Sequence, residues 1–568
     1  MQIDPPSGPP AESGAQSAAI APDSCSQLRR TMGFWDVLLF NIATVLGPRW
    51  IAAAGHNGPS SISLWVIAAV FFFVPGALVI NELSSRFPQE GGLYAWSREA
   101  FGPFHGFIAG WTYWIYTVFY FPGLLLASAS MAAYVLGGRG VILADNRTFL
   151  LTVSLAMLLV AVVLNIVGLN IGKWLQNAGG IGTYIPLLIL AGVAVWVCIR
   201  HGSVTHFTFA DILPKWDWNT VNFWSQIAFA FTGLELVSAM SEEVRDPRRT
   251  LPRAVFGAGA LIALMYIAGT FAVLTLLPSG NVDPQSGVFR AIAVGSEAVG
   301  FGFLGVLAAV LATAGNAGGV GTTVAGIARV PFVVGIDRYL PTAFGKIHPK
   351  WKTPYVSILV QAILSGAILL VSQINETTRG AYQMLVDAAI ILYFIPFLYM
   401  FAAVIKLGGR KDRNENPHAV LVPGGKPGVW ICGGLGFFVV LIGIVVSLIP
   451  PGDAASKAGF ELKLITGTVA SIALGLFLYW RAGWLGLRSR RRSQQPAFRY
   501  PQHSYASHQH HNRQGYCRYS RPDPLAWDSH CARAESRFHH GRRRLGRNRR
   551  LQPDDLQAAG QNPHHAGL

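Results

Sequence analysis

Long apolar runs recur along most of this chain, and they constrain its fold more than any other feature. A helix of about 20 apolar residues crosses the ~30 Å hydrocarbon core of a membrane, and several runs approach that length. The chain is 52% apolar and only 13% charged, whereas soluble domains carry about a quarter charged residues. The pattern predicts an all-α polytopic membrane protein with twelve spans, at approximately 34–56, 62–85, 104–135, 148–169, 177–199, 221–241, 254–277, 303–329, 354–372, 385–407, 429–449 and 462–482.

The net charge of +17 is explained by where the basic residues lie. Of the 45 Lys and Arg, 17 lie in the tail from Arg481 onward. With a cytoplasmic N-terminus, the cytoplasmic side of residues 1–480 holds 19, the opposite side holds 8, and Arg49 falls inside a span. This bias follows the positive-inside rule. It predicts a multi-pass plasma-membrane protein with both termini in the cytoplasm, a lipid bilayer as its surroundings, and no nucleic-acid partner.

Two of the expected spans are interrupted in corresponding places. The first carries LGPR at 46–49 and the sixth carries TGLE at 232–235. Proline removes a helix hydrogen bond and glycine weakens a helix by roughly 1 kcal/mol relative to alanine, so both spans are predicted to break. Five spans followed by five more have opposite orientations, which is the pattern of an inverted repeat with discontinuous helices. We expect repeat 1 over about 34–199, repeat 2 over about 221–407, and two extra C-terminal helices over about 429–482.

The two ends of the chain differ in composition from this region. Residues 1–30 are rich in Pro, Ser and Ala and are expected to form a disordered cytoplasmic leader. Residues 483–568 are rich in Arg and His and are expected to form a disordered basic cytoplasmic tail. The five cysteines have no CxxC spacing, so neither a structural disulfide nor a metal site is predicted.

Three cytoplasmic segments carry a set of motifs. NELSSRFPQEGGLYAWSREAFG occupies 81–102, MSEEVRDPRRTLPRAV occupies 240–255, and ARVPFVVGIDRYLPTAFGKIHPKWKTPYVSIL occupies 328–359. In this order around twelve spans, and with a Gly-x-Glu break in the sixth, they resemble the amino acid–polyamine–organocation permeases. The resemblance covers about residues 30–480 and rests on these positions: Glu82, Arg86, Phe87, Pro88, Gly91, Gly92, Tyr94, Gly233, Glu235, Glu243, Pro247, Pro252, Ala254, Arg329, Asp337, Leu340, Pro341, His348, Pro349, Thr353 and Pro354.

The resemblance implies the leucine-transporter-like fold and alternating access. The sequence departs from the family at the first break, where many members have a Gly-rich stretch such as Gly-Ser-Gly whose backbone amides hold the substrate carboxylate. Here only Gly47 is small, and Arg49 and Trp50 follow it.

Glu235 is an ionisable residue inside a span, and such residues usually face the bundle interior or a charged partner. Three roles are open. Glu235 carries a coupling proton, or it holds the ammonium group of a substrate, or it is a static ion-pair partner of Arg49. A similar acid in related antiporters is implicated in gating and proton coupling, which favours the first role.

Arg49 has two interpretations. It replaces a coupling sodium ion near the eighth span, or it receives the substrate carboxylate directly; both predict transport that is independent of sodium. Freed backbone groups at helix breaks line cavities, and together they suit a zwitterion. The expected substrate-binding residues are therefore Gly47, Arg49, Trp50, Phe229, Phe231, Thr232 and Gly233, although aromatic residues in membrane spans more often serve packing.

The cytoplasmic side offers two further candidates. Tyr94 resembles a gate tyrosine of the family, with an interfacial anchor as the alternative. Arg329 and Arg338 with Glu82, Glu242 and Asp246 form an expected cytoplasmic ion-pair latch, with topogenic charge as the alternative.

These observations predict a secondary active transporter of an amino acid or related amine, coupled to protons by symport or exchange. No Walker motif is present, so ATP is not the expected driver. The alternative is a membrane-embedded amino-acid sensor that binds without transporting. No catalytic constellation of a membrane enzyme is found, and neither a cofactor nor a metal is predicted.

Overall fold

The computed structural model describes residues 32–87, 91–167, 172–215, 217–236, 244–327, 339–351, 353–374, 376–409, 419–450 and 456–492. The expected leader, the tail from residue 493 onward, and Glu242, Arg329 and Arg338 lie outside these residues. The described part is helical throughout, in the order α1 (Phe34–Val45), α2 (Pro48–Asn57), α3 (Ser60–Ala68), η1 (Ala69–Phe73), α4 (Val74–Arg86), α5 (Leu93–Phe101), α6 (Pro103–Ala133), η2 (Tyr134–Arg139), α7 (Gly140–Leu143), α8 (Arg147–Val167), α9 (Gly172–His201), α10 (Phe209–Ile212), α11 (Trp218–Ala230), α12 (Pro247–Leu276), η4 (Ser279–Asn281), α13 (Gly287–Ala298), α14 (Phe303–Ile327), η5 (Thr342–Gly345), α16 (Tyr355–Ser372), α17 (Thr378–Gly408), α18 (Gly425–Val446) and α19 (Lys457–Arg492).

Within the described residues, ten helical stretches are long and apolar enough to cross a membrane. They correspond to ten of the twelve expected spans. The other two expected spans, 34–56 and 221–241, are the ones with the glycine-containing interruptions. The first is divided between α1 and α2, and α11 ends at Ala230, ahead of its glycine.

The interruption between α1 and α2 follows from two adjacent residues. Leu46 and Gly47 both have extended backbone, with ψ of 115° and 122°. Pro48 then occupies the first turn of α2, where its missing amide costs no hydrogen bond and its fixed φ suits a helix start. The chain therefore ends one helix and begins another within the apolar run.

The interruption after α11 depends on Gly233. Its φ of +111° lies in a region that residues with a Cβ rarely adopt. A Cβ on this glycine would also lie 3.1 Å from Cγ2 of Val45, the last residue of α1. The segment after α11 thus turns away from the helix axis and packs directly against the end of α1.

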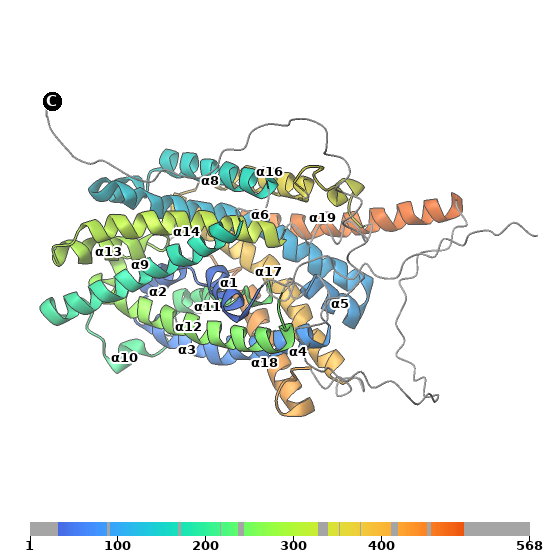
Figure 1. The fold of residues 1–568 in the computed structure, drawn as a ribbon, viewed down its shortest axis with the longest axis horizontal. Helices are drawn as coiled ribbons and strands as arrows, with labels where there is room; N and C mark the ends of the chain where they lie inside the picture. The colour runs from blue at the N-terminus through green and yellow to red at the C-terminus, as the bar shows by residue number, and fades with distance from the viewer. Residues whose placement is uncertain are drawn as a thin grey trace, which may run out of the picture. The chain divides into compact units, whose positions relative to one another are not determined.

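Several helices pack against the two interrupted spans or hold their neighbours together. α1 packs against α9, α12 and α14, while α6 packs along α17 (Figure 1). α9 and α14 run alongside each other and approach closely, because a Cβ on Gly182 of α9 would lie only 2.3 Å from the Leu311 carbonyl of α14. Such contacts between small residues are typical of membrane helices, which gain little from apolar burial against one another.

Candidate functional site

Glu235 lies just after the second interruption with its side chain buried, at 2% exposure. The Tyr113 hydroxyl of α6 donates a hydrogen bond to its Oε1 at 3.0 Å, and the Tyr393 hydroxyl of α17 donates to the same oxygen. The Gly233 amide donates to Oε2 at 3.0 Å. Elements far apart in the sequence thus supply hydrogen bonds to one carboxyl group, and this arrangement lets a charged or a protonated Glu235 be held inside the bundle.

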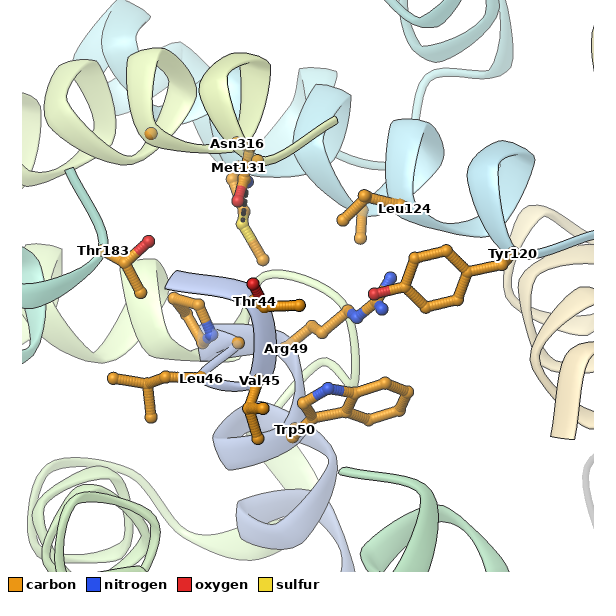
Figure 2. A pocket seen from close by; sticks show the side chains of 15 residues that line it. Thr44, Val45, Leu46, Arg49, Trp50, Tyr120, Leu124, Met131, Thr183 and Asn316 are labelled. Atoms are coloured by element: carbon orange, nitrogen blue, oxygen red, sulfur yellow. Dashed lines mark hydrogen bonds between the residues drawn. The ribbon is translucent and has the colours of Figure 1, made fainter. Parts of the chain in front are cut away.

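Arg49 is also buried, at 3% exposure, on the first turn of α2. Its guanidinium lies over the rings of Trp50 and Tyr120, with Cζ 4.4 Å and 4.7 Å from the two ring centroids. Figure 2 shows the side chain running between these two residues. Its Nε has no hydrogen-bond partner within the part of the chain that the structure describes.

Glu235 and Arg49 do not form the direct ion pair that was one of the open interpretations. The ion pairs found among the described residues do not include Arg49. The physical reason is that the Tyr113 and Tyr393 hydroxyls supply hydrogen bonds to the carboxyl group, while two aromatic faces surround the guanidinium.

A cavity of about 50 Å³ opens at the first interruption. It has room for roughly three to five water molecules. Its lining comes from the end of α1, the start of α2, and α6, α9 and α14: Thr44, Val45, Leu46, Gly47, Pro48, Arg49, Trp50, Tyr120, Leu124, Ala127, Met131, Thr183, Gly315, Asn316 and Gly319 (Figure 2). Arg49 is the one charged side chain among these lining residues.

The Tyr266 hydroxyl of α12 joins the two interruptions. It donates to the Val45 carbonyl at 2.7 Å, lies 3.1 Å from the Ala230 carbonyl, and accepts from the Gly47 amide at 3.4 Å. The ring is stacked on Trp65, with centroids 4.3 Å apart. Tyr266 is therefore held by packing while its hydroxyl satisfies backbone groups that the helix ends leave open.

The predicted substrate-binding residues separate into two sets. Gly47, Arg49 and Trp50 line the cavity. Phe229 and Phe231 are buried and do not line it; Phe229 packs edge-on against Trp50 at 5.6 Å.

The other two predicted residues, Thr232 and Gly233, belong to the second interruption. The Thr232 hydroxyl donates to the Phe229 carbonyl at 2.6 Å, and Gly233 packs on α1. Both shape the interruption beside the cavity.

Tyr94 is buried on α5, away from the lining residues of the cavity. The Arg98 guanidinium lies over its ring, 5.2 Å from the centroid. This contact does not test the expected gate role of Tyr94, which stays a prediction.

The expected latch residues within the described part have separate partners. Glu82 pairs with Arg86 at 3.0 Å and accepts from the Val422 amide at 2.8 Å. Asp246 is exposed and lies 3.9 Å from Arg249. The latch with Arg329 and Arg338 stays a prediction, because those residues lie outside the described part.

Sequence reasoning missed Tyr113, Tyr120, Tyr266 and Tyr393, four tyrosines that contact the two charged residues or the interruptions. One signal was present, since tyrosines in the middle of apolar runs need partners for their hydroxyls. Across the described residues, no group of three or more His, Cys, Asp or Glu side chains is arranged to hold a metal ion.

Comparison with known proteins places this chain in a family. The model of the amino acid permease family matches residues 32–470. An uncharacterised transporter of Legionella pneumophila is 27% identical over 80% of this chain and 96% of its own length. A probable agmatine/putrescine antiporter of Lactococcus lactis is 21% identical over 79% of this chain and 94% of its own. A serine/threonine exchanger of Bacillus subtilis is 25% identical over 69% of this chain and 86% of its own length.

The fold is similar to that of MhsT, crystallised in complex with L-phenylalanine. The TM-score is 0.54 at 13% sequence identity, covering 72% of this chain and 98% of that one. This likeness concerns the fold alone and agrees with the leucine-transporter-like arrangement expected from the sequence. With the family model matched over most of its length, the chain belongs to the amino acid permeases, a family of membrane transporters.

Proposed function

We propose that this permease is a secondary active transporter that moves an amino acid or related amine across the plasma membrane by alternating access. The observation that carries the proposal is the contact between the two interruptions. Gly233 packs on Val45, and the Tyr266 hydroxyl bonds to backbone at both places. Unsatisfied backbone is tolerated at membrane depth only beside a cavity or protein partners. The cavity at Gly47 and Arg49 is then the substrate site.

The proposed architecture has twelve spans, with α1–α2 and α11 with its continuation as the two discontinuous spans of a five-plus-five inverted repeat. Alternating access in such proteins comes from movement of one repeat against the other around a site near the midplane. The charge bias of the loops supports cytoplasmic positions for both termini.

Glu235 is proposed to carry the coupling proton. The carboxyl group is buried and accepts hydrogen bonds from the Tyr113 hydroxyl and the Gly233 amide, and these groups can hold it before and after it exchanges a proton. Tyr113 lies on α6 and Tyr393 on α17, so a movement of either helix relative to the second interruption changes the hydrogen bonds to the carboxyl group. Proton release is thereby linked to the conformation.

Purified protein in liposomes tests this proposal. Radiolabelled amino acids and putrescine, each supplied singly, are expected to show uptake of at least one compound above empty liposomes when the lumen is alkaline. A protonophore is expected to abolish accumulation above the outside concentration. Binding of a compound without any flux would favour the sensor and overturn transport.

A further inference from the structure

Arg49 is a buried cation whose described contacts include no anion. A charge removed from water is costly unless it is paired and hydrogen-bonded. Contact with two aromatic faces recovers part of that cost. No hydrogen bond or ion pair to the guanidinium is found among the described residues, and its Nε is buried without a partner.

The cavity supplies no compensating charge either. Its described lining contains Arg49 and otherwise neutral side chains, such as Thr44 and Asn316. Glu235 is not among the lining residues, and its carboxyl group already accepts hydrogen bonds from two tyrosines and a backbone amide. When Glu235 carries its proton, the negative charge that balances Arg49 therefore has to come with the ligand.

We propose that the site selects substrates of net charge −1, and specifically dicarboxylic amino acids such as glutamate and aspartate. One substrate carboxylate pairs with the Arg49 guanidinium, whose fork of N–H donors matches a carboxylate. The other two charged groups of the substrate then cancel each other, so the buried complex is neutral. A neutral zwitterion would leave one positive charge in the cavity, and a polyamine would leave several.

The proposal rests on the proposed function only in taking this cavity as the transport site. It excludes amines from the substrates named in the proposed function, even though one relative is named as an agmatine/putrescine antiporter. The cavity of about 50 Å³ admits a carboxylate but not a whole amino acid. Substrate binding therefore requires the walls of the cavity to move apart, as expected of a protein that alternates between conformations.

Thermal stabilisation of the purified full chain measures the preference for dicarboxylic amino acids, because a ligand that binds the native state raises the melting temperature of the protein. The probes are L-glutamate, L-aspartate, L-glutamine and putrescine at equal concentration and ionic strength. We expect stabilisation by the two dicarboxylates and little or none by glutamine or putrescine. Equal or greater stabilisation by glutamine or putrescine, or no shift with either dicarboxylate, would overturn the proposal.

Variants of Arg49 connect the preference to the residue. Arg49→Gln is expected to raise the Kd for glutamate by at least about thirtyfold, the loss typical of truncating one member of a buried charge pair. The variant is also expected to bind glutamine at least as well as glutamate. Arg49→Lys, which keeps the charge, is expected to retain the order of preference with weaker binding. Arg290→Gln is the matched control, because that guanidinium donates to the Asn281 carbonyl and does not line the cavity. Unchanged glutamate affinity in Arg49→Gln would contradict the assignment.

Uptake measured in parallel separates this inference from the proposed function. Flux of glutamine or putrescine that glutamate does not inhibit would overturn the charge preference while leaving transport intact. Stabilisation by glutamate with no flux of any probe would overturn transport and leave the charge preference standing.

Discussion

The Tyr266 hydroxyl donates a hydrogen bond to the Val45 carbonyl at 2.7 Å, although 221 residues separate the two in the sequence. Val45 is the last residue of α1, and the Ala230 carbonyl, 3.1 Å from the same hydroxyl, belongs to the last residue of α11. The last carbonyls of a helix have no partner within it. One side chain thus lies between the ends of both helices: its hydroxyl proton is donated to the Val45 carbonyl, and its oxygen lies close to the Ala230 carbonyl.

Tyr266→Phe tests the importance of this connection. The ring and its stacking on Trp65 are retained, while the bonds to Val45 and Gly47 are lost. A buried carbonyl left unsatisfied costs about 1–3 kcal/mol, so the free energy of unfolding is expected to fall by that amount. Reversible unfolding in mixed micelles measures it. We also expect slower uptake in liposomes, because the two interruptions no longer move together.

Tyr382→Phe is the matched control for this change. Tyr382 is equally buried, and its hydroxyl has no hydrogen-bond partner among the described residues. Its removal leaves no buried carbonyl without a donor, so the free energy of unfolding is expected to stay the same or to rise. If both variants lose the same stability, the Tyr266 hydroxyl is not acting through its backbone contacts.

The interruptions were predictable because their causes are local. Pro48 lacks the amide that would continue the hydrogen bonding of α1 and suits a helix start, and the glycine of the Gly-x-Glu sequence weakens the helix at the second interruption. The partners of these interruptions were not predictable in the same way. Tyr113 and Tyr393 lie 122 and 158 residues from Glu235, and no local pattern indicates which tyrosine of a membrane helix faces inward.

A direct Glu235–Arg49 contact, one of the three roles left open for Glu235, illustrates the same limit. Two opposite charges inside a bundle suggest an ion pair when only the sequence is known. The outcome depends on side-chain direction, and Arg49 extends between Trp50 and Tyr120 instead. Aromatic rings therefore contact the guanidinium and phenol hydroxyls bond to the carboxyl group, where the alternative had a single ion pair.

Transport is expected to be independent of sodium. Carbonyls at the ends of two broken helices would suit a cation, but here Val45 and Ala230 converge on the Tyr266 hydroxyl. The Arg49 guanidinium lines the same interruption and repels a second cation. Uptake at a constant pH gradient should stay the same when choline replaces sodium. A rate that rises with a sodium gradient and ignores pH would refute this prediction.

Glu235→Gln is expected to uncouple transport from protons. Glutamine accepts the hydrogen bonds of Tyr113 and Tyr393 but cannot release a proton. Accumulation driven by an alkaline lumen should disappear, whereas exchange of labelled for unlabelled substrate continues. Uptake at several external pH values, with and without a protonophore, distinguishes the two activities.

A second buried carboxylate provides the comparison for Glu235. Asp387 on α17 is fully buried and accepts hydrogen bonds from Gln383 at 3.1 and 3.2 Å. Asp387→Asn is expected to keep proton-driven accumulation, since Asp387 contacts neither interruption among the hydrogen bonds of the described residues. Accumulation that survives in Glu235→Gln and is lost in Asp387→Asn would transfer the coupling role to Asp387.

The Glu82–Arg86 pair is expected to stabilise the C-terminal end of α4 far more than the exposed Asp246–Arg249 pair stabilises the start of α12. The side chains of the first pair are 0% and 4% exposed and lie 3.0 Å apart; those of the second are 59% and 81% exposed at 3.9 Å. Glu82→Gln removes the negative charge beside a buried guanidinium that also donates to the Leu407 carbonyl, so the free energy of unfolding should fall by about 3 kcal/mol. Asp246→Asn should change it by less than about 1 kcal/mol, because solvent screens that pair and asparagine tolerates the left-handed backbone, φ 45°, found there. Reversible unfolding of the two variants measures the difference, and equal losses would show that burial does not set the strength of these ion pairs.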